Sequence, residues 1–185
     1  MASYLPNLIC KGWMEIKILK EDQRGFLAIQ LFTIMIVIVF AVASLLIGTA
    51  FAARKNAVMT YDWFGAAMDF AATAANRDKG AADAASRTND AWRWFGYAFS
   101  QMTDTTFNGG SFTPKGKSIY PGPIKLNSFT YNAPGQPVPG GTAQQPGYTA
   151  TIEVPVIGGD LPFIGPQYVT VPMRYFGVIK SQTVQ

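Results

Sequence analysis

The stretch Phe26-Leu-Ala-Ile-Gln-Leu-Phe-Thr-Ile-Met-Ile-Val-Ile-Val-Phe40 continues to Ala53 without a charged residue or a proline. This apolar run is longer than the roughly 20 residues that a helix needs to cross a bilayer core of about 30 Å. Lipid offers the backbone no hydrogen-bonding partner, so a lone spanning segment is expected to be an α-helix. The sequence therefore predicts a transmembrane helix over 26–53, in preference to a buried helix of a soluble protein.

The flanks of the apolar run favour one orientation in the membrane. The sequence Lys20-Glu-Asp-Gln-Arg-Gly25 directly precedes it and ends a leader of mixed character, residues 1–25. Lys17, Lys20 and Arg24 stand before the run, and Arg54 and Lys55 stand after it. Because cytoplasmic flanks carry an excess of positive charge, the cytoplasmic side is slightly favoured for the N-terminus. The leader is then cytoplasmic, and the chain after the transmembrane helix lies outside the cytoplasm.

Residue usage argues against an enzyme or a metalloprotein. The chain has one cysteine, Cys10, and no histidine, which excludes an intramolecular disulfide and the usual zinc, haem and iron–sulfur ligand sets. Nucleophilic triads usually draw on histidine, and the Gly-Lys-Ser at 116–118 lacks the glycine spacing of a P-loop. Asp62 and Asp69 would lie about 10 Å apart on one helix face, too far for a cooperating pair. We expect no catalytic residues, no metal and no cofactor.

The basic residues are too dispersed to predict nucleic-acid binding. Lys115, Lys117 and Lys125 stand close together, and the formal net charge is +4. A positive patch attracts anionic polymers, but scattered basic residues usually serve solubility. We therefore expect contact with nucleic acid to be incidental.

Helical periodicity continues beyond the membrane segment. From Ala57 to Ala75 no proline occurs, and apolar residues gather opposite a polar face. That polar face contains Asp62, Asp69, Thr73 and Asn76. The cluster Asn76-Arg-Asp-Lys-Gly80 predicts the first break in the helix.

A second amphipathic helix is predicted over Ala81–Met102. Its apolar face contains Ala81, Ala85, Trp92, Phe95, Phe99 and Met102. Trp94 and Tyr97 interrupt the polar face, where they would contact the C-terminal part of the chain, a neighbouring subunit or the membrane surface. The sequence leaves these alternatives open.

The chain after Asp104 has the composition of strands and loops. Gly109-Gly110, Pro121-Gly-Pro123 and the segment 133–147 exclude helix by their glycine and proline density. The predicted strands are Ile124–Tyr131, Tyr148–Val156 and Tyr168–Ile179, with Pro155 and Pro172 marking ends, edges or bulges. The expected fold class is α+β: the leader, the transmembrane helix, a helical region over 54–103 and a β-rich domain over 104–185.

Arg24-Gly25 followed by Phe26-Leu-Ala-Ile-Gln30 resembles the class III signal sequence of type IV pilin-like proteins. The resemblance implies that a prepilin peptidase cuts after Gly25 and that the new N-terminal Phe26 is methylated. The fifth mature residue of that family is usually glutamate, which helps to bring subunits into register. This chain has Gln30 there, whose amide forms hydrogen bonds but cannot neutralise an ammonium group. The small size and single N-terminal helix are also similar to the pseudopilins of tight-adherence pilus systems.

The resemblance implies a structural function. A pilin or pseudopilin waits in membrane lipid, in the inner or cytoplasmic membrane, until the pilus assembly machinery extracts it into an extracellular filament. Its partners are other copies of itself, the prepilin peptidase and that machinery. Gln30 is the expected assembly residue, and Trp92, Trp94 and Tyr97 are the candidate subunit interface.

Two other interpretations of the N-terminal region remain. In one, Gly25 is a linker residue of an uncleaved signal anchor, and the chain is a permanently anchored single-pass protein whose outer domain binds a partner or a cell-wall polymer. In the other, signal peptidase cleaves after Ala50-Phe51-Ala52, which fits the small-x-small pattern. The apolar run is longer than the core of an ordinary secretory signal, which disfavours this second interpretation.

Overall fold

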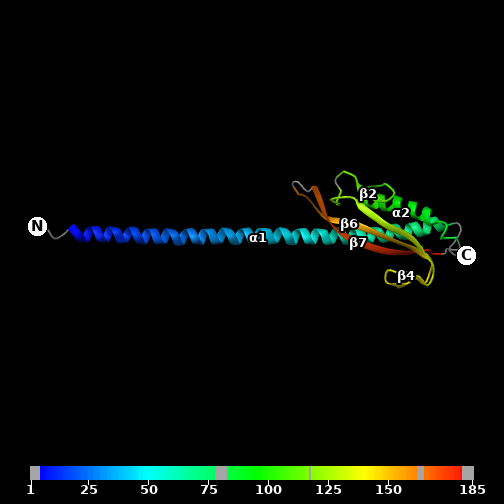
Figure 1. Cartoon of the computed structure of the whole chain (residues 1–185), viewed down its shortest axis with the longest axis horizontal. Helices are drawn as coiled ribbons and strands as arrows, with labels where there is room; N and C mark the ends of the chain where they lie inside the picture. Colours follow the sequence, from blue (N-terminus) through cyan, green and yellow to red (C-terminus); the bar gives the residue numbers. More distant parts are fainter. Residues whose placement is uncertain (1–4, 78–82, 117, 162–164, 181–185) are drawn as a thin grey trace. The chain divides into compact units, whose positions relative to one another are not determined.

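The structure is a computed structural model that describes residues 5–77, 83–116, 118–161 and 165–180. It contains helices α1 (Leu5–Asn76) and α2 (Thr88–Thr103) and an antiparallel sheet, so the predicted α+β class is confirmed (Figure 1). The strands are β1 (Thr105–Phe107), β2 (Ser111–Pro114), β3 (Ile124–Asn132), β4 (Pro137–Val138), β5 (Gly141–Thr142), β6 (Gly147–Leu161) and β7 (Gly165–Val178). The chain forms two compact units, Met1–Thr49 and Ala50–Gln185.

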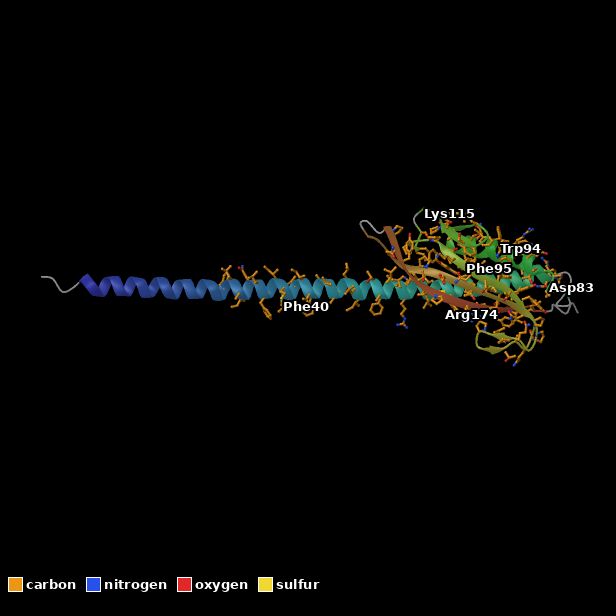
Figure 2. The ribbon with its side chains drawn as sticks, in the orientation of Figure 1. Phe40, Asp83, Trp94, Phe95, Lys115 and Arg174 are labelled. Carbon is orange, nitrogen blue, oxygen red and sulfur yellow. The ribbon has the colours of Figure 1, made fainter. Side chains whose placement is uncertain are left out.

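In the first unit, α1 has an uncovered apolar surface. Every side chain from Gly25 to Thr49 is exposed, including Phe40 at 69% (Figure 2). Thr33 donates its hydroxyl hydrogen bond to the carbonyl of Ile29, and Thr49 donates to that of Leu46, each at 2.9 Å. Among the described residues, α1 from Gly25 onward is the one helix long and apolar enough to cross a membrane by length and composition.

The second unit contains a five-stranded sheet in the order β1-β2-β3-β6-β7, antiparallel at every pairing. Its three long strands are those that the sequence predicts, with β6 and β7 extended toward their common turn. Pro155 stands at the register shift of β6, and Pro172 lies in the edge strand β7, as predicted for proline in a sheet. The short strands β1, β2, β4 and β5 were not predicted.

The core of this unit lies between the sheet and the two helices. Along β6 the side chains of Tyr148, Ala150, Ile152 and Val154 are buried, alternating with residues that face the other side. Phe64 of α1 meets Phe95 and Phe99 of α2 edge to face, with ring centroids 5.7 and 6.0 Å apart. It also meets Tyr175 of β7 at 6.0 Å. The apolar face of α1 therefore closes the inner side of the sheet.

Helix α2 begins at Thr88, so the predicted start at Ala81 is wrong for the described residues 83–87; Ala81 itself lies outside them. These residues form turns in which the Ser86 amide and hydroxyl both donate to the carbonyl of Asp83, at 3.1 and 2.8 Å. The Thr88 hydroxyl donates to the carbonyl of Ala85 at 2.8 Å. Serine and threonine thus offer the backbone local partners that compete with helix.

Asn76 is buried, although the sequence placed it on the polar face of α1. Its amide donates to the carbonyl of Ala72 at 2.9 Å and to the Tyr148 hydroxyl at 3.2 Å. The Tyr148 hydroxyl in turn donates to the carbonyl of Ala84 at 2.8 Å. Burial raises the pKa of the Tyr148 phenol, against the lowering effect of the Asn76 bond, so the hydroxyl stays protonated and able to donate. One tyrosine of β6 thus ties the end of α1 to the turn before α2.

We expect Tyr148→Phe to lower the free energy of unfolding by about 1–3 kcal/mol, because it removes two buried hydrogen bonds, one to the Ala84 carbonyl and one from the Asn76 amide. Urea unfolding of the full chain in detergent, followed by near-UV circular dichroism, measures this change. Tyr97→Phe is the matched control, since Tyr97 is 58% exposed, and we expect a change within about 0.5 kcal/mol. Equal losses in the two variants would contradict a structural role for the buried hydroxyl.

Candidate functional site

The predicted processing segment, Gly25–Gln30, lies within α1. Glycine in place of alanine inside a helix destabilises the helix by roughly 1 kcal/mol. A packing contact that only glycine permits would explain its presence at position 25. A Cβ placed on Gly25 would meet no other atom within 4 Å. The described structure therefore supplies no packing reason for glycine at this position, and a larger side chain fits there without a clash.

Phe26 and Gln30 are neighbours one helical turn apart on the surface of α1. Phe26 is 64% exposed, and Gln30 is also exposed. Unlike Thr33 and Thr49, which bond to carbonyls of their own helix, Gln30 makes no side-chain hydrogen bond within the described residues. An unpaired amide is costly in hydrocarbon, and such side chains hydrogen-bond across helices in membranes. Gln30 is thus the group in this segment whose polar atoms need a partner from another molecule.

The three aromatic residues of the candidate interface lie in two different environments. Trp92 is half-buried and packs edge to face on Phe107 of β1, with ring centroids 5.1 Å apart. Trp94 and Tyr97 are 43% and 58% exposed, with centroids 6.3 Å apart. Trp92 thus helps to hold α2 on the sheet, and only Trp94 and Tyr97 present substantial surface to another molecule.

Phe70 of α1 belongs to the same exposed surface, although the sequence did not assign it to the interface. It is 44% exposed and meets Trp94 at 5.9 Å in an edge-to-face contact. The sequence does contain a signal for it. The apolar face of α1 is wider than the part that the core buries, so some apolar residues at its margin must be exposed. We call Phe70, Trp94 and Tyr97 the aromatic surface; Figure 2 labels Trp94 beside the buried Phe95.

Two hollows flank the exposed side chains Arg93 and Tyr97. The first, of about 380 Å³, is lined by Asp90, Arg93, Trp94 and Tyr97. The second, of about 400 Å³, lies toward the sheet and also includes Trp92, Phe107 and Lys115 in its lining. Aromatic walls with charged residues around them suit contact with another protein surface. Such a surface can bind another molecule.

Two further features concern the titratable groups of the described residues. No three His, Cys, Asp or Glu side chains gather there as a group able to hold a metal ion. Burial raises the pKa of Tyr120, whose hydroxyl shares a hydrogen bond of 2.9 Å with Thr60, and the pKa of Tyr175. Both phenols lie in packing contacts between α1 and other elements of the second unit, which is a structural role.

Comparisons of the chain with models of protein families, with characterised proteins and with solved structures found no match. Function is therefore inferred from the residues and their geometry.

Proposed function

We propose that this protein is a structural subunit, a pilin or pseudopilin, of a type IV pilus-like surface filament. The observation that carries the proposal is α1, which has an uncovered apolar surface over Phe26–Thr49 directly after Gly25 and supplies core residues of the second unit over Ala50–Asn76. A helix that is apolar all round needs lipid or other helices around it. A filament subunit uses both, first in the membrane and then in the assembly.

Processing would precede assembly. Prepilin peptidase hydrolyses the Gly25–Phe26 peptide bond, which leaves the new amine on Phe26 for methylation. Until assembly the subunit spans the inner or cytoplasmic membrane with its N-terminus in the cytoplasm. Lipid tails are about as apolar as leucine, so exchanging lipid for neighbouring helices is nearly neutral in hydrophobic free energy. The pilus assembly machinery must therefore supply the direction of the exchange.

Two sets of side chains would hold the copies together. The Gln30 carbonyl oxygen accepts a hydrogen bond from a neighbouring amine, and its NH2 group donates to a neighbouring carbonyl, without any charge pairing. The aromatic surface supplies lateral contact outside the membrane, where exposed Trp and Tyr are typical anchors of protein interfaces.

The alternative is a permanently anchored single-pass protein whose outer unit binds a partner or a cell-wall polymer. The specific observation in its favour is that α1 runs without a break from Leu5 through Gly25, as an uncleaved anchor would. The hollows beside Arg93 and Tyr97 would then hold the ligand.

The N-terminal residue of the mature chain separates these functions. We expect Phe26, methylated, in both the membrane fraction and the material sheared from the cell surface. Gly25→Glu should block cleavage and leave the full-length chain in the membrane, and intact mass measures both outcomes. Gln23→Glu adds the same charge two residues earlier and should be processed normally. Met1 in the wild-type membrane fraction, with none of the protein in sheared material, would instead establish the anchored protein.

The residue at position 30 tests the assembly chemistry. Gln30→Glu should assemble like the wild type if register depends on a hydrogen-bond acceptor, because the carboxylate retains one. Gln30→Leu, which fills similar space without polar atoms, should be processed but reduce the filament yield. The measurement is the amount of protein in sheared material relative to membrane. Normal yield from Gln30→Leu would show that this amide plays no part in assembly.

The aromatic surface makes a separate prediction. Trp94→Ala should reduce filament yield roughly tenfold, the effect of losing a central aromatic contact of somewhat more than 1 kcal/mol. Ile119→Ala is the control, since Ile119 is similarly exposed but lies outside this surface. Sheared protein is again compared with membrane protein. Equal yields from the two variants would remove Trp94 from the subunit interface.

A further inference from the structure

The exposed side of α1 in the second unit presents basic residues first and acidic residues later. Arg54, Lys55 and Asp62 are exposed and Asp69 is half-exposed, and no ion pair joins them to other described residues. At the positions three and four residues away from each of them, where helical ion pairs form, the sequence has no opposite charge. These charges are therefore not arranged to satisfy one another within their own helix.

Helix geometry explains why the two sets cannot meet within one copy. Arg54 precedes Asp62 by eight residues, or about 12 Å along the axis and about 80° around it. It precedes Asp69 by fifteen residues, or about 22 Å and about 60°. Both separations along the axis exceed the reach of a salt bridge, so a partner must come from water, ions or another molecule.

Apolar side chains that the second unit does not cover lie beside these charges. Phe51 is 67% exposed and Val58 is 56% exposed, and Ala66 between the two aspartates is exposed as well. Phe64 and Met68 are completely buried against α2 and the sheet. An uncovered helix surface with basic residues at its start and acidic residues further along is complementary to a shifted copy of itself.

We infer that this exposed surface of α1 is where further copies of the chain dock, with Arg54 of one copy paired to Asp62 or Asp69 of the next. The two α1 helices are parallel and shifted along their axes by about 12–22 Å, the separations of the residues that pair. This inference rests on the proposed filament function, which fixes the parallel orientation because all copies enter the assembly from one membrane. With no shift, Arg54 would face Arg54 and each aspartate would face its own equivalent, which is repulsive.

The angle around the helix between Arg54 and the aspartates allows such contacts to continue from copy to copy. Arg54 lies about 60–80° around the helix from the two aspartates, so one copy can receive a neighbour on its acidic face while its own arginine engages another. A contact between two different faces is heterologous and continues into a filament instead of closing as a dimer. Arginine suits this role because its planar fork binds a carboxylate through two parallel hydrogen bonds.

Lys55 is a basic residue next to Arg54 that is not expected to form this contact. It has the same charge as Arg54, but it lies only about 20° around the helix from Asp62 and thus shares the acidic face. A shifted contact between two copies through that single face would occupy it and leave no second face for a third copy. Reversal of the charge at Lys55 should therefore affect assembly less than reversal at Arg54.

Disulfide trapping in filaments tests the shift directly. Cys10→Ser removes the natural thiol, and Arg54→Cys is combined with Asp62→Cys in one variant and with Asp69→Cys in another. Within one copy both pairs exceed the roughly 7 Å between Cα atoms that a disulfide tolerates, so any bridge joins two copies. We expect oxidised filaments of at least one double variant to give a ladder of multimers on non-reducing gels, and Arg54→Cys alone to stay monomeric. A dimer from Arg54→Cys alone, or intact filaments without a ladder in both double variants, would overturn the shifted contact.

Charge exchange supplies a second readout. Arg54→Asp and Asp62→Arg should each lower the ratio of sheared to membrane protein about tenfold, and the two together should restore most of it. Lys55→Asp, as the control, should lower the ratio less than threefold. Failure of the double variant to exceed both single variants would overturn the pairing with Asp62, and the Asp69→Arg exchange tests the other aspartate in the same way. Absence of filaments from the wild type would contradict the proposed function itself, whereas normal wild-type filaments without trapping or rescue would contradict only this docking.

Discussion

Burial of one face of α1 is the constraint on which the second unit depends. The sheet has an apolar inner side along β6, and α2 alone does not close it. Phe64 of α1 meets Phe95, Phe99 and Tyr175, and so joins both helices to the edge strand. Because the segment Ala50–Asn76 is part of this core, any contact that a partner makes with its outer face acts on the folded unit as a whole. Folding and the proposed docking thus use different residues of the same helix segment.

Local patterns predicted the elements that are long enough to show a period. The 3.6-residue period identified the helix ending at Asn76, and the two-residue alternation identified β3, β6 and β7. β1 and β2 have three and four residues, too few for any period to appear. The burial of Asn76 depends on Tyr148, 72 residues away in the chain. A contact of that sequence separation leaves no local signal, which is why the sequence assigned Asn76 to the solvent.

The candidate site also has a part that the sequence could predict and a part that it could not. The segment from Gly25 to Gln30 is defined by local chemistry, so it could be proposed from the sequence alone. The sequence could place Trp92 and Trp94 only on roughly opposite faces of a helix, because helical positions two residues apart differ by about 200°. Which of the exposed aromatics form a surface depended on Phe70, a residue of the other helix. Spatial neighbours from separate elements are what the sequence could not combine.

The uneven distribution of polar groups along α1 bears on how copies would find their register. Hydrophobic contact is non-directional, so an apolar helix surface permits many axial shifts of nearly equal free energy. Polar groups at a helix interface select one shift, because every other shift leaves them unpaired or places like charges together. Gln30 has that property in the apolar segment, and Arg54, Asp62 and Asp69 have it in the second unit. A few such groups are sufficient to select one shift, since a wrong shift leaves all of them without their partners at once.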